Sequence, residues 1–388
     1  MRLAEIATYV NEKISSSNIT LDQYVTTDSL LQDKRGREYA QNLPPVTTKL
    51  IHYQPGDVLV ANIRPYLKKV WFADCEGGAS SDVLVLRAKN ANDTTFVYAL
   101  LMQDSFYDYA MKGAKGSKMP RGDKDQIMRY EFPIFSPEQR KDIGKFITDI
   151  ESKIAVNRQI NDNLEAMAKQ LYDYWFVQFD FPNEEGKPYK SSGGKMVWND
   201  KLKQEIPDGW SDSTLSEICV MYQPQTIGTD LLLPNGVYRV YGANGIVGKY
   251  DQYNHEDSEI AMACRGNSCG VVNRTMPYSW ITGNAMVLQM KDKGVSNEYI
   301  KQSVSYMNIS GAISGSGQPQ LTRENLNIVK CLKPAHNVLL SFSQLIEPIV
   351  TAQLHIIEEN DKITKLRDEL LPLLMNGQVS VNYHLSHD

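Results

Sequence analysis

The chain has 388 residues, a formal net charge of −5, 42% hydrophobic residues and 22% charged residues. This composition is typical of a soluble globular protein of two or three domains, and it argues against a chain that binds nucleic acid through its overall charge. No apolar run is long enough to cross a membrane, and the five scattered cysteines fit a reducing compartment, so we expect a cytoplasmic protein.

The two halves of the sequence resemble each other. Leu-Ala-Glu-Ile at 3–6 matches Leu-Ser-Glu-Ile at 215–218, and SDVLVLRA at 81–88 resembles GNAMVLQM at 283–290. In each half, short β-rich segments are broken by Gly, Pro and Asn and are followed by a short helical pattern. The sequence therefore predicts an α+β fold with two similar α/β domains related by an internal repeat.

Each predicted domain is followed by a long helix. The first is expected from about Pro137 to about Val177, with Ser136 as its N-cap. Its apolar positions predict a coiled-coil seam with one short step near Asn157. The seam consists of Ile143, Ile147, Ile150, Ile154, Ile160, Leu164, Met167 and Leu171.

The second long helix is expected within 338–376, with Pro348 as a kink or as its true start. The numerical shift that places Asn157 on Asn360 also places Ile160 on Ile363. In an antiparallel pair, only the midpoints face their own equivalents. The two asparagines should therefore meet in the seam, or else both face solvent where the heptad slips.

An irregular connector rich in Gly, Ser, Lys and Pro is predicted between the first helix and the second domain. The expected boundaries are a first domain at 1–135, a first long helix at 136–178, the connector at 179–205, a second domain at 206–336, and a second long helix with a C-terminal tail at 337–388.

A Gly-Ser loop occurs once in each domain. Gly-Ser-x-x-Pro at 116–120 is repeated at 315–319, and each copy is accompanied by different polar residues. Glycine lets a backbone approach a ligand closely, and Lys, Arg and Gln carry donors that suit phosphates and base edges. Upstream, Arg64 and Arg265 stand at matching places. Any single residue is most simply a solvated surface residue, but the duplicated loop as a unit indicates binding.

The candidate DNA-binding residues come from these loops and from the upstream stretches. They are Arg64, Tyr66, Lys68, Lys115, Gly116, Ser117, Lys118 and Arg121 in the first domain, and Arg265, Asn267, Gly315, Ser316, Gly317, Gln318, Gln320 and Arg323 in the second.

Catalytic and metal-binding motifs are not found. There is no phosphate-binding Gly-x4-Gly-Lys loop and no glycine-rich methyl-donor motif between a strand and a helix. Cys264 and Cys269 have no second pair to complete a zinc site, so we interpret them as buried free thiols. We expect no cofactor and no catalytic residue in this chain.

Several segments resemble the specificity subunit of type I restriction–modification systems (HsdS-like), and the resemblance covers nearly the whole chain. The first domain departs from the pattern because it lacks a Pro-x-Gly-Trp opening. The segments that carry the resemblance are IPDGW at 206–210, LSEI at 215–218, SGSGQPQLTRENLNIVKCLKP at 314–334, SPEQRKDIGKFITDIESKI at 136–154 and LEAMAKQLYDYWFVQFDFP at 164–182.

The resemblance implies two target-recognition domains, each of which reads one half of a bipartite double-stranded DNA site. It implies that the two helices pair antiparallel, set the spacer and dock two modification (methyltransferase) subunits, which carry S-adenosylmethionine and methylate adenine. Restriction subunits, if present, would use ATP and Mg²⁺. Two alternatives remain open from the residues: a coiled-coil adaptor that binds only proteins, and an enzyme that modifies DNA by itself.

Overall fold

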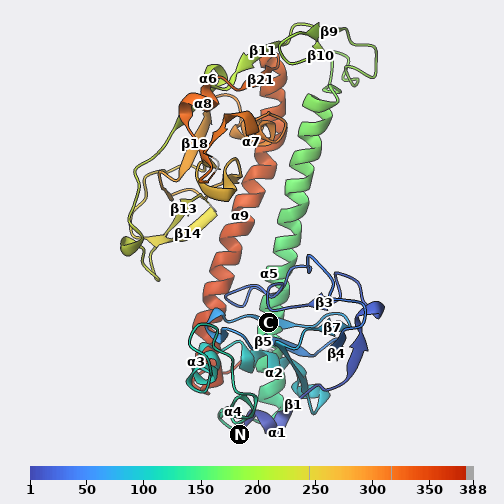
Figure 1. The fold of residues 1–388 in the computed structure, drawn as a ribbon, viewed down its shortest axis with the longest axis vertical. Helices are drawn as coiled ribbons and strands as arrows, with labels where there is room; N and C mark the ends of the chain where they lie inside the picture. Colours follow the sequence, from blue (N-terminus) through green and yellow to red (C-terminus); the bar gives the residue numbers. More distant parts are fainter. Residues whose placement is uncertain (244, 316, 382–388) are drawn as a thin grey trace, which may run out of the picture. The chain divides into compact units, whose positions relative to one another are not determined.

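The computed structural model describes residues 1–243, 245–315 and 317–381. The chain forms two compact units, Met1–Asn157 with Glu359–Asp388, and Arg158–Glu358. Each unit holds one globular domain together with a part of each long helix (Figure 1). The boundary between the units therefore runs through both helices.

The first unit contains two four-stranded sheets, with strand orders β1-β8-β5-β6 and β2-β4-β7-β3. All pairings are antiparallel except that of β3 with β7. The strands are β1 Ala7–Tyr9, β2 Lys13–Ser15, β3 Tyr24–Val25, β4 Lys49–Tyr53, β5 Val58–Ala61, β6 Val70–Phe72, β7 Gly77–Ala79 and β8 Val83–Ala88. Its short helices are α1 Leu3–Ile6, α2 Thr94–Leu101, α3 Asp104–Lys112 and α4 Lys124–Met128.

The second unit has one four-stranded sheet, β12-β18-β15-β16, and a three-stranded sheet, β14-β13-β17. Its strands are β9 Met196–Asn199, β10 Gln204–Pro207, β11 Ser211–Thr214, β12 Cys219–Tyr222, β13 Tyr238–Gly242, β14 Gly245–Tyr250, β15 Ile260–Ala263, β16 Val272–Arg274, β17 Trp280–Ile281, β18 Ala285–Met290, β19 Ile313–Ser314, β20 Gln320–Leu321 and β21 Lys330–Lys333. Its short helices are α6 Leu215–Ile218, α7 Asn297–Val304 and α8 Arg323–Asn327.

The predicted internal repeat is confirmed by the sheet topology. The order β1-β8-β5-β6 in the first unit corresponds strand by strand to β12-β18-β15-β16 in the second, and all of these pairings are antiparallel. In each unit a short helix, α2 or α7, follows the second strand of this order. The second sheets differ between the units, so the two domains share one framework and carry different additions.

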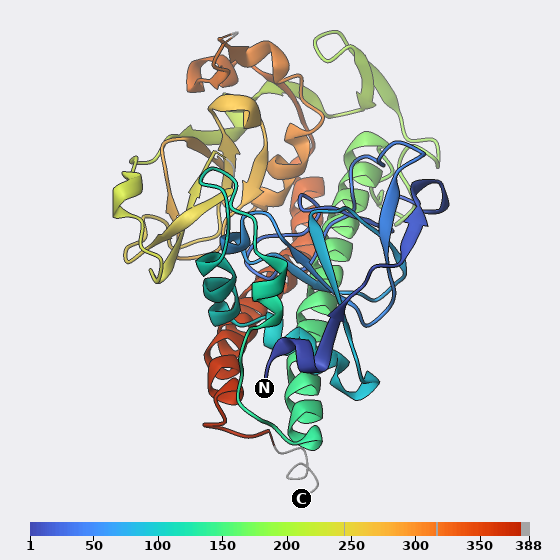
Figure 2. The same cartoon turned by 60° about the horizontal axis from the view of Figure 1, so that its bottom comes forward.

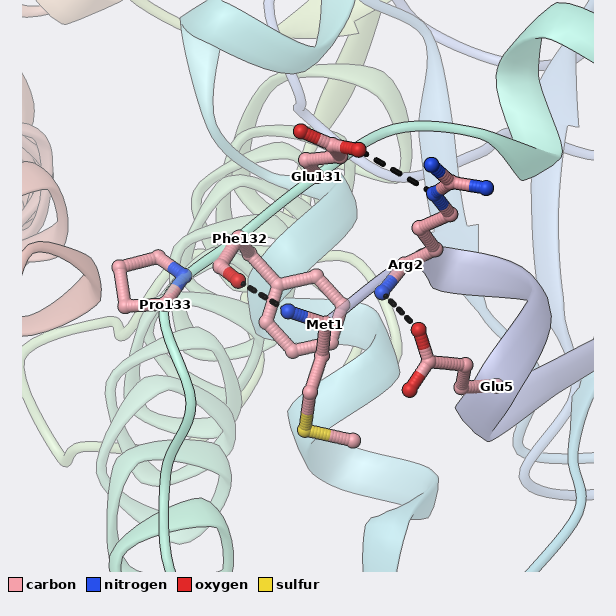
Figure 3. A pocket seen from close by; sticks show the side chains of 6 residues that line it. All are labelled: Met1, Arg2, Glu5, Glu131, Phe132 and Pro133. Carbon is pink, nitrogen blue, oxygen red and sulfur yellow. Dashed lines mark hydrogen bonds and ion pairs between the residues drawn. The ribbon is translucent and has the colours of Figure 1, made fainter.

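The N-terminal segment is fixed to the first domain by backbone pairing. The Met1 amino nitrogen donates to the Phe132 carbonyl at 2.8 Å, and Arg2 forms a β-bridge with Glu131 (Figure 3). The side chains of Arg2 and Glu131 also form an ion pair at 3.1 Å. Both residues line the pocket that Figure 3 shows. The corresponding segment of the second unit, β11, pairs with β21 in the same way.

The predicted match between the two opening motifs is also confirmed. Both motifs form four-residue helices, α1 and α6. In each helix the glutamate accepts a hydrogen bond from the backbone nitrogen of the residue before the helix: Arg2 N to Glu5 at 2.8 Å, and Thr214 N to Glu217 at 3.2 Å. The glutamate satisfies a donor that the first helical turn leaves free, which explains why this residue type recurs.

The aromatic residues after the first long helix pack against the start of the second domain. Trp210 stacks on Phe181 with ring centroids 4.9 Å apart, and it also contacts Phe176 and Phe179. The motifs at 164–182 and 206–210 therefore contribute their aromatic residues to one buried cluster. Between them, the connector was predicted to be irregular, but it contains the hairpin of β9 and β10.

The first long helix, α5, spans Pro137–Tyr172 and continues as a π-helical turn over Asp173–Val177. Ser136 caps it as predicted: the Gln139 nitrogen donates to the Ser136 hydroxyl at 3.2 Å, and the Ser136 nitrogen donates to the Gln139 side chain at 2.9 Å. This reciprocal pair is a capping box.

The predicted slip in the α5 seam is wrong. Buried and half-buried positions continue in alternating steps of four and three, and Ile160 and Met167 are exposed by 42% and 51%. Asn157 itself occupies a seam position and is only 2% exposed. The seam consists of Ile143, Ile147, Ile150, Ile154, Asn157, Asn161, Leu164 and Ala168.

The second long helix, α9, spans His336–Met375. Pro348 therefore does not mark its start: the helix begins twelve residues earlier and passes through the proline. Buried and half-buried positions along one face of this helix also keep steps of four and three. They are Ile346, Val350, Gln353, Ile357, Asn360, Thr364, Arg367, Leu371 and Leu374.

Several polar contacts join the helices within the first unit. Asn157 donates from Nδ2 to Asn360 Oδ1 at 2.9 Å, which confirms the predicted meeting of the two asparagines. One heptad further along α9, Arg367 is 3% exposed and pairs with Glu151 at 2.5 Å. As residue numbers rise on α5 they fall on α9, so the two helices are antiparallel.

The second unit has its own polar contact on the same two helices. Glu165 of α5 accepts hydrogen bonds from Gln353 of α9 at 3.0 Å and from Lys301 of α7 at 2.6 Å. Burial alone would raise the pKa of Glu165, but the hydrogen bonds outweigh it and hold the pKa below its ordinary value. Because Gln353, Asn360 and Arg367 are seven residues apart on α9, this helix presents a polar group to the seam in three successive heptads.

We predict that replacing Asn360 by Leu destabilises the protein by about 0.5–1.5 kcal/mol, because the buried Asn157 would lose one of its two partners and keep only Glu359. Replacing both Asn157 and Asn360 by Leu should recover or exceed the original stability, since apolar pairs are as good as or better than buried polar ones. Denaturant unfolding measures both effects. The exposed change Ile160→Ala is the control and should stay within about 0.5 kcal/mol. A double variant less stable than the single one would contradict this account.

Candidate nucleic-acid interface

The Gly-Ser loop of the first domain is a tight hairpin between α3 and α4. Lys115 N donates to Arg121 O at 3.0 Å, and Arg121 N donates to Lys115 O at 2.9 Å. Gly116 has a φ of +96°, a left-handed conformation that favours glycine. Figure 2 shows this loop (teal) extending beyond the two helices. Ser117, Lys118 and Met119 are exposed at its tip.

The loop of the second domain has the same construction. β19 and β20 pair through Ser314 and Gln320, and Gly315 has a φ of +84°. A Cβ on Gly315 would lie 2.5 Å from the Gln318 carbonyl oxygen, so only glycine fits. Gly317 and Gln318 are exposed, whereas the predicted site residue Ser316 lies outside the described residues.

In both domains a second turn is hydrogen-bonded to the Gly-Ser loop. The Arg64 nitrogen donates to Pro120 O at 2.7 Å, and the Gly266 nitrogen donates to Pro319 O at 2.9 Å. Each turn continues as a short 3-10 segment, Pro65–Leu67 or Gly266–Ser268. The two stretches that the sequence singled out separately thus form one surface in each domain.

The predicted match of Arg64 with Arg265 is wrong by one residue. The hydrogen bonds to the loop prolines equate Arg64 with Gly266. The β-bridges Ile63 to Arg121 and Arg265 to Gln320 equate Ile63 with Arg265. The two arginine side chains are therefore attached one position apart in an otherwise similar turn.

Three of the predicted basic residues of the first domain are engaged in ion pairs. Lys68 pairs with Asp104 at 3.0 Å, Arg121 with Asp82 at 2.6 Å, and Lys115 with Asp123 at 3.5 Å. Burial alone would raise the pKa of Asp104, but hydrogen bonds from Lys34 and Lys68 outweigh it and lower the pKa.

The remaining predicted residues of the first domain are differently placed. Tyr66 is 49% exposed at the second turn, and Lys118 is exposed at the loop tip. Arg64 is half-buried. The Lys118 side chain has no ion-pair partner within the described ranges. Its charge is therefore available to a ligand.

In the second domain the predicted polar side chains that the structure describes are exposed. Neither Arg265 nor Arg323 has an ion-pair partner in the part of the chain that the structure describes. Arg323 is the first residue of α8, directly after its cap Thr322. The corresponding residue of the first domain is Lys124, the first residue of α4 after its cap Asp123. The exposed set is Arg265, Asn267, Gln318, Gln320 and Arg323.

An aromatic group in the second domain was missed by the sequence reasoning. Tyr238 and Tyr253 have ring centroids 5.0 Å apart, and Tyr253 and Tyr278 have centroids 5.3 Å apart. Tyr278 is 53% exposed and has a φ of +52°, which is unusual for a side chain of this size. The tyrosines come from separate segments of the chain, so no local pattern marks them; the only signal was the density of Tyr between 238 and 253.

Catalytic and metal-binding geometry is not found on the described part of the molecule. Across residues 1–243, 245–315 and 317–381, no cluster of His, Cys, Asp or Glu could hold a metal ion, and no helix is long and apolar enough to span a membrane. All five cysteines are free. Cys264 is buried as expected, but Cys269 is half-buried, with its thiol 3.2 Å from the Pro319 carbonyl oxygen.

Comparison with known sequences identifies the family. The sequence model described as "Type I restriction modification DNA specificity domain" matches residues 1–166 and 207–331, well over half of the chain. The chain belongs to this family. The two matched segments each contain one copy of the Gly-Ser loop and its partner turn.

Named relatives agree with this assignment. The chain is 23% identical to the HindI specificity subunit of Haemophilus influenzae, covering 87% of this chain and 89% of the relative. It is 20% identical to the MjaIX specificity subunit of Methanocaldococcus jannaschii, covering 74% and 69%. The fold is similar to that of the type I S subunit from M. genitalium, with a TM-score of 0.57, 15% identity, and coverage of 97% of this chain and 95% of that chain.

The family defines the role of the chain. It is a DNA sequence-recognition subunit of a type I restriction–modification system, has no catalytic role and carries no cofactor of its own. The family assignment supports DNA recognition rather than an adaptor that binds only proteins or a self-sufficient DNA-modifying enzyme.

We predict that Gly315→Ala disturbs the second loop and that Gly317→Ala does not. Alanine at 315 must adopt a left-handed φ and place its Cβ against a carbonyl oxygen, whereas a Cβ at 317 meets no atom within 4 Å. The left-handed conformation alone costs about 1–2 kcal/mol. Amide hydrogen exchange of a peptide covering 313–321 should accelerate for Gly315→Ala only. Equal exchange in the two variants would show that the loop does not depend on this glycine.

Proposed function

We propose that each domain reads one half of a bipartite double-stranded DNA site through the surface formed by its Gly-Ser loop and the turn bonded to it. The observation that carries the proposal is that both domains use the same loop-and-turn hydrogen bonding but attach different side chains to it. A common framework with variable side chains is what two readers of different sequences require.

The side chains of the two surfaces suit different contacts. In the first domain, Lys118 and the loop backbone near Gly116 and Ser117 are suited to phosphates, and Tyr66 can contact sugar or base. In the second, Gln318 and Gln320 suit adenine, because a Gln amide pairs with N6 and N7 in the major groove. Arg265, Asn267 and Arg323 add donors for guanine or phosphate. Lys68, Lys115 and Arg121 are already paired, so we assign them a supporting role.

The partners in this proposal are DNA and two modification subunits, which supply S-adenosylmethionine and methylate adenine, with restriction subunits that use ATP and Mg²⁺ if the system has them. We place the complex in the cytoplasm. Exposed apolar side chains recur at helical spacing on one face of each long helix, and an apolar stripe of this kind is a surface that another subunit can cover. They are Val156, Ile160 and Met167 on α5, and Leu345, Leu366 and Leu373 on α9.

We predict that changing Gln318, Gln320 and Arg323 to Ala weakens recognition of one half-site and leaves the other unaltered. Changing Arg64 and Lys118 should affect only the other half-site. Each lost base contact is worth about 1–3 kcal/mol. Mapping methylated adenines in DNA from cells that carry the protein with its partners gives the wild-type site, and competition binding of the complex then measures each half. If both half-sites respond equally to either set, one domain does not read one half-site.

We also propose that the lengths of α5 and α9, 36 and 40 residues, set the spacer between the half-sites. Inserting one heptad into each helix adds about 10 Å, close to three base pairs. We expect the preferred spacer to lengthen by about two to three base pairs while the half-site sequences stay the same. Binding should also weaken unless the DNA twists to compensate. Selection from duplexes with varied spacers measures this, and an unchanged spacer would exclude the helices as the measuring element.

A further inference from the structure

Arg64 stands in a backbone conformation that arginine rarely adopts. Its φ is +53° and its ψ is 62°, in the left-handed region. The next residue is Pro65, which is buried at the start of the 3-10 segment. Left-handed backbone at a residue other than glycine is unfavourable and persists only where the surrounding structure enforces it; such residues concentrate at ligand-binding positions.

The second domain shows what the turn itself requires. Gly266 occupies the position of Arg64, makes the corresponding hydrogen bond to a loop proline, and has a φ of +74°. The turn therefore needs left-handed backbone at this position, and glycine supplies it without strain. A Cβ on Gly266 would meet no atom within 4 Å, so the space beside the turn is open to a side chain. An arginine in the first domain keeps a side chain where glycine would be the more stable choice.

The Arg64 side chain is half-buried, and its hydrogen bonding is incomplete. Its Nε is buried without a hydrogen-bond partner, and so is Oδ1 of Asn62, two residues earlier on the same strand-to-turn segment. Native proteins pair nearly all buried polar atoms, so this unpaired donor leaves the guanidinium of Arg64 incompletely bonded within the protein, next to the proposed binding surface.

A second cation, Lys69, lies near Arg64. Burial lowers the pKa of Lys69, and the nearby Arg64 charge lowers it further, while Asp28 and Glu38 act in the opposite direction. By contrast, Lys68, Lys115 and Arg121 each form an ion pair with an aspartate. Within the residues that the structure describes, Arg64 has no ion-pair partner, and its backbone nitrogen is hydrogen-bonded to the Gly-Ser loop.

We propose that Arg64 is the main base-reading residue of the first domain and recognises a guanine in its half-site through O6 and N7. This inference rests on the proposed function. A planar guanidinium matches the two acceptors of guanine in the major groove, and recognition at a base edge needs a side chain whose position is fixed. A phosphate contact needs only a nearby charge, which the exposed Lys118 supplies without strain.

The second domain has no side chain at this position, because Gly266 replaces the arginine. The arginine of the second domain, Arg265, occupies the preceding position of the turn, which is that of Ile63 in the first domain. We therefore expect the second half-site to be read without an equivalent of the Arg64 contact, so that the two half-sites differ in sequence.

The test uses the complete complex with its modification subunits and a library of duplexes randomised in one half-site at a time. Wild-type protein should select a guanine at one position of the first half-site. Arg64→Gly should lose that preference by about ten- to hundredfold, the range of one bidentate pair, and keep the preferences at the other positions. Because glycine relieves the strained backbone, the melting temperature of Arg64→Gly should equal or exceed that of the wild type.

Two further variants separate base reading from charge. Arg64→Lys keeps the charge but not the planar fork, so it should lose the guanine preference while retaining most of the overall affinity. Lys118→Ala should weaken binding to all sequences about equally and reduce the salt dependence of binding. Wild-type protein that selects no bipartite sequence would overturn the proposed function itself. Wild-type selection of a bipartite site, with guanine retained in Arg64→Gly or with that variant less stable than wild type, would overturn the assignment of Arg64 alone.

Discussion

The rest of the structure depends on the burial of the apolar faces of both long helices in the cores of both domains. In the first unit, Ile147 of α5 and Leu371 of α9 belong to one core with α2. In the second, Tyr172 of α5 and Phe342 of α9 belong to the core that contains α7. These side chains lie at opposite ends of each helix. Each domain therefore completes its core with helix from both halves of the sequence, which explains why the compact units cut through the helices.

Polar groups within the seam help to fix the register of α5 against α9. Asn157 and Asn360 are equivalents in the repeat and bond to each other, whereas the flanking contacts use Arg367 with Glu151 and Gln353 with Glu165. Buried polar pairs add little net stability, but a slipped register would leave them unpaired. In the flanking pairs both carboxylates, Glu151 and Glu165, belong to α5. The asparagine pair therefore follows the internal symmetry, and the flanking pairs do not.

The two proposed recognition surfaces share one backbone design and carry different side chains. The positive φ of Gly116 and Gly315 forms the same hairpin in each domain, and each hairpin holds the neighbouring turn through a proline carbonyl. The side chains that project from this frame are not constrained to match. The clearest difference is at one position of the turn, which Arg64 occupies in one domain and Gly266 in the other.

The sequence by itself determined the internal repeat, both long helices, the Ser136 cap and the twin Gly-Ser loops, because local rules of propensity, capping and left-handed glycine act over a few residues. Only the tertiary structure decided which seam residues are buried: Ile160 is apolar but exposed, and Asn157 is polar but buried, because the partner helix selects the face. It also decided which basic loop residues form ion pairs with aspartates far away in the sequence, as Arg121 does with Asp82. The equivalence of Arg64 with Gly266 likewise follows from hydrogen bonds between segments far apart in the chain, which no local pattern records.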